Sequence, residues 1–181
     1  MSQKEVSRSA QRRTKLHSAS YAGDLTQAHF AGIGRVAVEW TILEDLIHRY
    51  YSELLRFPHA QGRKRAAEIG KVSVLLAQMN TELAKSSSPG ECRAFRTLKS
   101  AILQCARERD RIVHSVWFRL SKPPYAEAWR TTHRRGFSAK RYTPQSLDAW
   151  VERIHKTIDG LVHFMVLYRQ KRELAYPLDN P

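Results

Sequence analysis

Hydrophobic residues recur at steps of three and four along four long stretches of the chain, which is the period of an amphipathic α-helix. The predicted helices span about residues 24–56, 65–85, 91–114 and 144–176. Asp24 is a candidate N-cap for the first helix, and Thr143 followed by Pro144 is a typical helix start. Four helices that each carry one apolar face are expected to pack together as a bundle.

The helical period is interrupted in three places. Residues 57–62 and 86–90 contain Pro and Gly and predict loops. Between the third and fourth helices, residues 117–120 and 125–132 are short, aromatic and β-prone. We therefore predict a β-hairpin insertion at about residues 116–142, directly before the last helix.

The first 22 residues differ from the rest of the chain in composition. Five of them are Lys or Arg, one is acidic and few are apolar, which is typical of a mobile basic arm or a loosely docked helix. Residues 23–181 are expected to form a single domain, since domains usually hold about 100–150 residues. The predicted fold class is mainly α: a four-helix bundle with this arm and a short hairpin.

The charge of the chain narrows the class of partner. The sequence holds 31 Lys and Arg against 17 Asp and Glu, a formal net charge of +14 at pH 7. Such an excess favours a polyanionic partner, because cationic side chains release counterions from phosphates. A nucleic acid is the expected partner, although charge alone does not separate specific from non-specific binding.

Several features favour the cytoplasm and no membrane association. No apolar run reaches the roughly 18 residues of a membrane span, and residues 1–20 lack the pattern of a secretory signal. Cys92 and Cys105 fall on one predicted helix, about 20 Å apart. That separation is too large for a disulfide, so free thiols in a reducing compartment are expected.

One residue interrupts the apolar face of the third predicted helix. The positions of that face are Phe95, Leu98, Ile102, Cys105, Arg109 and Ile112. A guanidinium on such a face is destabilising unless it is paired or opens onto a cleft. Arg109 is therefore expected to pair with an acid, for which Glu44 is the candidate, or to reach water from the helix end.

Polar residues gather around His114 at the end of this helix. Asp110 lies four residues before His114 on the same face and can orient its imidazole. Arg107 and Arg111 lie on nearly the same side and supply positive charge. Arg109 lies about 140° away around the helix. The two side chains can meet at one phosphate only through the length of Arg109 or a loosening of the helix end.

The hexapeptide Arg-Asp-Arg-Ile-Val-His at residues 109–114 resembles the signature of the HEPN superfamily (higher-eukaryote and prokaryote nucleotide-binding domains). In that signature an Arg, usually followed by Asn, Asp or His, precedes a His by four to six intervening residues. Trp117 and the stretch from Trp40 to Glu44 also resemble bacterial members. The resemblance extends over residues 24–174 and implies a HEPN-like bundle; a second register beginning at Arg107 is also compatible.

The resemblance implies an endoribonuclease that needs no metal or other cofactor. In such an enzyme the 2′-hydroxyl of RNA attacks the adjacent phosphate and leaves a 2′,3′-cyclic phosphate. His114 would transfer protons, since an imidazole exchanges protons near neutral pH. Arg109 would stabilise the negative phosphorane and Asp110 would fix the imidazole tautomer. The resemblance also implies a homodimer, a toxin or phage-defence role, and an antitoxin or defence-complex partner.

Basic and aromatic residues alternate beyond the motif, where residues 117–143 hold seven Lys and Arg against one acid. Basic groups can follow a phosphate backbone while rings stack on unpaired bases; alternate rings can instead pack the hairpin onto the bundle. The predicted RNA-binding residues are Arg107, Arg111, Trp117, Arg119, Arg130, Arg134, Arg135, Lys140 and Arg141.

Two functions remain open from the sequence. The first is the metal-independent endoribonuclease, and the alternative is a non-catalytic HEPN-like subunit that binds RNA or scaffolds a larger defence complex. No metal site is predicted, because the histidines lack the pairing and Cys-x-x-Cys spacing of zinc ligands.

Overall fold

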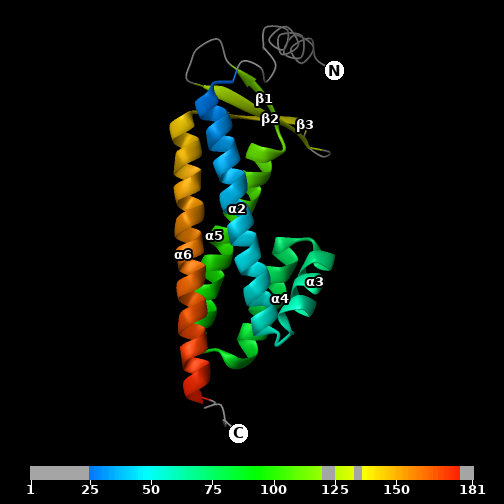
Figure 1. Cartoon of the computed structure of the whole chain (residues 1–181), viewed down its shortest axis with the longest axis vertical. Coiled ribbons are helices and arrows are strands. Elements are labelled where there is room, and N and C mark those ends of the chain that lie inside the picture. Colours follow the sequence, from blue (N-terminus) through cyan, green and yellow to red (C-terminus); the bar gives the residue numbers. More distant parts are fainter. Residues whose placement is uncertain (1–24, 120–124, 133–135, 176–181) are drawn as a thin grey trace, which may run out of the picture.

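The computed structural model describes residues 25–119, 125–132 and 136–175. Within these ranges the fold is mainly α, with five helices and a short three-stranded antiparallel sheet before the last helix (Figure 1). The elements are α2 (Gln27–Leu54), α3 (His59–Ile69), α4 (Val72–Ser86), α5 (Pro89–Val113), β1 (Val116–Arg119), β2 (Ala126–Thr132), β3 (Gly136–Tyr142) and α6 (Pro144–Ala175). The predicted basic arm at residues 1–22 lies outside the described residues.

The three longest helices, α2, α5 and α6, lie side by side along the long axis of the molecule (Figure 1). Helices α3 and α4 pack on one flank, where α3 contacts α2 and α4 contacts both α2 and α5. The sheet covers one end, next to the C-terminal end of α5 and the N-terminal end of α6 (Figure 1). This arrangement puts residues 109–114 at the junction between the helices and the sheet.

Helix α2 confirms the first predicted apolar face, because Val36, Trp40, Leu43 and Ile47 are all buried. The helix is capped at its start by Thr26, whose side-chain oxygen accepts a hydrogen bond from the backbone N–H of His29. The predicted cap at residue 24 lies outside the described residues.

The second predicted helix is wrong in one respect, because the structure divides that region into α3 and α4. Gly70 ends α3 with a φ of 62°, a left-handed conformation that glycine adopts without strain. The predicted loop at residues 57–62 is also shorter than expected, since α3 already begins at residue 59. Gly62 lies inside α3, where a Cβ would come within 2.0 Å of the Ser52 Oγ, so this glycine permits close packing on α2.

The insertion has three strands rather than the two of the predicted hairpin. Strand β2 is central: Trp117 of β1 lies opposite Ala128, and Lys140 of β3 lies opposite Ala128 on the other side. The third strand was missed because it is largely polar and lacks a clear alternation of apolar residues. Its pairing with β2, a contact between separate segments, defines it instead.

The predicted start of the last helix is confirmed. Thr143 accepts a hydrogen bond at its Oγ1 from the backbone N–H of Ser146, at 3.1 Å, and Pro144 is the first helical residue. Cys92 and Cys105 are free thiols, as expected from their separation along α5. Within the described ranges, no helix combines the length and apolar character required to cross a membrane.

Candidate functional site

Arg109 and His114 meet at the end of α5. His114 follows the last helical residue, and its φ of −108° and ψ of 16° depart from helical values. The Nη1 atom of Arg109 lies 3.0 Å from the Nε2 atom of His114. The helix end is therefore loosened at His114, which is one of the two ways in which the sequence allowed these side chains to meet. They converge on one exposed position.

This contact has a defined direction. A guanidinium can only donate hydrogen bonds, so Arg109 Nη1 donates and the Nε2 atom of His114 accepts. Two side chains this close together can both contact one anionic group bound between them. The pair is thus suited to hold an anionic group and to exchange a proton with it.

The guanidinium of Arg109 is held between an aromatic ring and a carboxylate. Its Cζ lies 6.0 Å from the ring centroid of Trp40 on α2, and Nη1 lies 3.2 Å from Oδ1 of Asp110. The side chain is 26% exposed, and its Nε is buried without a hydrogen-bond partner among the described residues. The side chain therefore occupies a half-buried position between α2 and the end of α5.

The partner expected for Arg109 is corrected by this geometry. Within the described residues, Glu44 makes no hydrogen bond or ion pair with Arg109. The ring of Trp40, one turn earlier on α2, faces the guanidinium instead. The carboxylate at Arg109 comes from Asp110, the next residue on the same helix.

Asp110 connects α5 to the sheet. Its Oδ2 lies 3.7 Å from Nη2 of Arg130 on β2, while its Oδ1 faces Arg109. No hydrogen bond joins Asp110 to the ring of His114 among the described residues, so the expected orientation of the imidazole by this carboxylate is not seen. This ion pair places Arg130, one of the predicted RNA-binding residues, next to residues 109–114.

A second polar cluster, which the sequence did not reveal, ties β3 to α5. The carboxylate of Glu108 accepts hydrogen bonds from the Tyr142 hydroxyl and from Lys140 Nζ. Lys140 Nζ also lies over the rings of Tyr142, at 5.2 Å, and Trp150, at 5.4 Å. Burial, together with the neighbouring Glu108, raises the pKa of Tyr142, which keeps its hydroxyl as a neutral donor.

This cluster changes the interpretation of two predicted RNA-binding residues. Lys140 is engaged with Glu108 and two rings, so it braces the sheet and is not held ready for a phosphate. Trp117 is only 7% exposed, and its Nε1 donates to the Ile112 carbonyl oxygen at 2.9 Å. The ring of Trp117 is therefore part of the core beside Tyr142 and presents little surface to RNA.

The remaining predicted RNA-binding residues are spread over several parts of the surface. Arg107 is exposed on α5, and Arg111 is half-buried near the motif. Arg141 on β3 donates from Nε to Glu127 at 2.8 Å and is largely exposed. The side chain of Arg119 and the whole of residues 134 and 135 lie outside the described residues.

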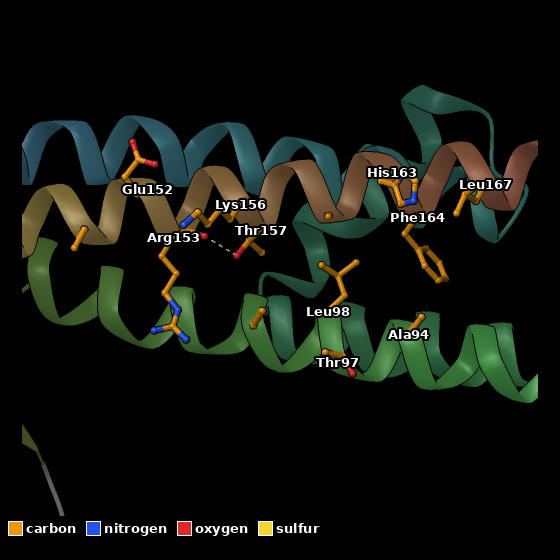
Figure 2. Close-up of a pocket in the computed structure, with 13 residues that line it drawn as sticks. Ala94, Thr97, Leu98, Glu152, Arg153, Lys156, Thr157, His163, Phe164 and Leu167 are labelled. Atoms are coloured by element: carbon orange, nitrogen blue, oxygen red, sulfur yellow. Dashed lines mark hydrogen bonds between the residues drawn. The ribbon is translucent and has the colours of Figure 1, made fainter.

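A groove of about 840 Å³ lies between α5 and α6, away from the motif (Figure 2). Small residues, Ala94 and Ala101 on α5 and Gly160 on α6, leave it open. Figure 2 shows Arg153 reaching from α6 toward α5, where it donates to Gln104 at 2.9 Å. Neither Arg109 nor His114 lines this groove.

Searches of protein-family models, of curated proteins and of solved structures found no match to this chain. Among the described residues, no group of three or more His, Cys, Asp or Glu side chains is placed to hold a metal ion. The arrangement at the end of α5 can bind an anion through Arg109 and exchange a proton through the exposed His114.

Proposed function

We propose that this protein is a HEPN-type endoribonuclease that cleaves RNA without a metal ion. The proposal includes a HEPN-like bundle, a toxin or phage-defence role in the cytoplasm, and a homodimer in which two copies of His114 share one groove. The observation that carries it is the 3.0 Å contact between Arg109 Nη1 and His114 Nε2 at an exposed helix end. A net charge of +14 supports RNA as the partner.

In the proposed reaction, the scissile phosphate displaces Arg109 from His114 and binds to the guanidinium. His114 Nε2, which accepts a hydrogen bond from Arg109 in this structure, then takes the proton of the 2′-hydroxyl. The 2′-oxygen attacks phosphorus, and the bond from phosphorus to the 5′-oxygen breaks. The products are a 2′,3′-cyclic phosphate and a 5′-hydroxyl, whose proton comes from water or from the second copy of His114.

Arg109 has the larger electrostatic role in this scheme. Its donors would stabilise the negative charge that the phosphorane gains, an effect often worth about 3–4 kcal/mol in comparable sites. Trp40 and Asp110 hold the guanidinium near this position before substrate arrives. Such support reduces the reorganisation required when the charge develops.

The experiment uses the purified full chain with total RNA in excess EDTA. Cleavage should persist in EDTA, and His114→Ala should lower its rate by about 10²–10⁴ while the protein stays folded. His163→Ala is the matched control, because His163 is exposed on α6 beside the groove and distant in sequence from the motif. Cleavage by His114→Ala at the parental rate would contradict the proposal.

The second candidate is a non-catalytic subunit that binds RNA or scaffolds a defence complex. The observation that favours it is that no carboxylate among the described residues contacts His114, since Asp110 forms ion pairs with Arg109 and Arg130 instead. Such a protein would retard RNA in a gel while leaving it intact, in the parent and in His114→Ala alike.

A further inference from the structure

Strand β2 brings a second guanidinium to the end of α5. Side chains alternate along a strand, and Ala126 and Ala128 of β2 are buried against the helices. Arg130, two residues further along, therefore points to the same side of the sheet. Its Nη2 atom lies 3.7 Å from the Oδ2 atom of Asp110. The sheet thus adds a cation to the candidate site at residues 109–114.

The carboxylate of Asp110 lies between two guanidiniums. Its Oδ1 atom is 3.2 Å from Nη1 of Arg109, and its Oδ2 atom faces Arg130. Each oxygen is therefore contacted by a different arginine. A phosphate group in RNA also offers two oxygens that share a negative charge, and guanidiniums bind such groups well. A phosphate can therefore take the position of this carboxylate.

The same position lies beside His114. The Nη1 atom of Arg109 contacts both Asp110 Oδ1, at 3.2 Å, and His114 Nε2, at 3.0 Å. This nitrogen carries two N–H groups, so both contacts can be made at once. An anion that replaced the carboxylate would share a donor atom with His114. The proposed reaction requires the scissile phosphate at such a place, next to the group that takes the proton.

The ion pairs of Asp110 are accessible to a ligand. Both Asp110 and Arg130 are partly exposed to solvent. Exposed ion pairs contribute little to stability, because water screens the charges. The carboxylate can therefore leave the two arginines at a small cost in free energy when another anion arrives.

We propose that Arg109 and Arg130 form one binding site for the scissile phosphate of RNA, and that Asp110 occupies this site until RNA displaces it. The inference rests on the proposed function for the identity of the ligand. It adds a second guanidinium, supplied by the sheet, and an internal competitor for the phosphate. Two guanidiniums on one phosphate would stabilise the charge of the phosphorane more than Arg109 does alone.

The test measures binding of a fluorescent oligodeoxythymidylate over a series of salt concentrations. DNA offers the same phosphates but lacks the 2′-hydroxyl, so the proposed reaction cannot cleave it. Arg130→Gln should weaken binding by roughly 10-fold and reduce the slope of log K against log salt by about 0.7. Arg130→Lys should restore most of the slope, because it keeps the charge. Circular dichroism and thermal unfolding check the fold of each variant.

Asp110→Asn should have the opposite effect. It removes the competing negative charge and should tighten DNA binding by about 2- to 5-fold, the equilibrium equivalent of one exposed ion pair. The gain should be smaller when Arg130→Gln is also present, because one of the two guanidiniums that Asp110 blocks is then absent. A mere effect of charge at a distance would instead be additive.

Arg35 and Asp148 provide the matched controls. They form a partly exposed ion pair between α2 and α6, and Arg35 lies about 140° around α2 from Trp40, which contacts Arg109. Arg35→Gln and Asp148→Asn change the net charge by the same amounts as the test variants. They should alter DNA affinity by no more than about two-fold, because salt screens charges that lie away from the bound strand.

The outcomes separate this inference from the proposed function. If Arg130→Gln binds DNA as Arg35→Gln does, or Asp110→Asn binds no tighter than Asp148→Asn, the two-arginine site is wrong. A parent protein that does not bind the oligodeoxythymidylate would overturn it as well. If the binding results hold but the parent leaves RNA intact, the phosphate site stands and the ribonuclease fails. If they do not hold and cleavage still depends on His114, the ribonuclease stands without Arg130.

Discussion

Helix α5 carries charged side chains at both ends, and the two sets are built differently. At the N-terminal end, Ser88 and Glu91 form a capping box in which each side chain accepts a hydrogen bond from the backbone of the other. Lys171 of α6 then donates to Glu91 at 2.9 Å. An acid near the positive end of a helix dipole is thus also paired with a cation, an arrangement that stabilises the fold.

At the C-terminal end, Arg109 contacts His114, a residue that becomes cationic when protonated. Asp110 offers one carboxylate, but it is 47% exposed and shared with Arg130. Contacts of this kind contribute little to stability, because water screens exposed charges. At the N-terminal end of α5, the charges of Glu91 and Lys171 neutralise each other. At the C-terminal end, the hydrogen-bond donors of Arg109 remain suited to bind an anionic ligand.

The largest expected effect at the C-terminal end is on catalysis. Arg109→Ala should lower RNA cleavage by about 10²–10³, because it removes the donors for the phosphorane. Arg107→Ala is the matched control: Arg107 is exposed two residues earlier, and its loss should change the rate by no more than a few-fold. Single-turnover cleavage decides between them. If Arg107→Ala lowers the cleavage rate as much as Arg109→Ala does, Arg109 has no special role, and the alternative motif register that begins at Arg107 is supported.

At the N-terminal end, the expected effect is on stability. Hydrogen bonds from Lys171 and Ser88 lower the pKa of Glu91 from 4.5 to about 2. Its contribution is therefore complete above pH 4.5 and is lost as the pH falls from there toward 2. Glu91→Gln should reduce the free energy of unfolding at pH 7 by about 1–2 kcal/mol, with a smaller difference from the parent at pH 3.

Urea denaturation at pH 7, 5 and 3 measures this difference. Glu152→Gln, at an exposed position on α6, should leave the free energy of unfolding nearly unchanged and serves as the control. Cleavage at neutral pH should equal the parental rate in both variants. If the difference in the free energy of unfolding between Glu91→Gln and the parent grows as the pH falls, the predicted direction of the pH dependence is wrong.

The smallest effect is expected in the cluster that joins the sheet to α5. Tyr142→Phe removes one hydrogen bond to Glu108 but leaves the one from Lys140. The free energy of unfolding should fall by about 0.5–1.5 kcal/mol, measured by urea denaturation. Cleavage should change little. If the rate instead falls as far as in Arg109→Ala, the end of α5 depends on the sheet for its catalytic geometry, and the cluster belongs with the site.

Much of this protein was readable from local pattern. The apolar faces of α2, α5 and α6, the start of α6 after Thr143, and the position of Arg109 on an otherwise apolar face all follow from the helical period. These features depend on residues three or four apart, whose mutual placement is set by helix geometry. Helix geometry also indicated that Arg109 and His114 can come together only through the length of the Arg109 side chain or a loosening of the helix end. In the structure the two side chains are 3.0 Å apart at that end.

Other features required contacts between segments that are distant in the sequence. The division of the second predicted helix, the third strand and the partner of Glu108 all depend on such contacts. The same is true of Trp117 and Trp129, both aromatic residues in the predicted insertion. Trp117 is buried against α5, whereas Trp129 lies on the face of the sheet turned away from the helices. A shift of one residue in strand register exchanges the two faces of a sheet. Composition alone cannot assign those faces, because only the packing of the sheet against the helices selects which one is buried.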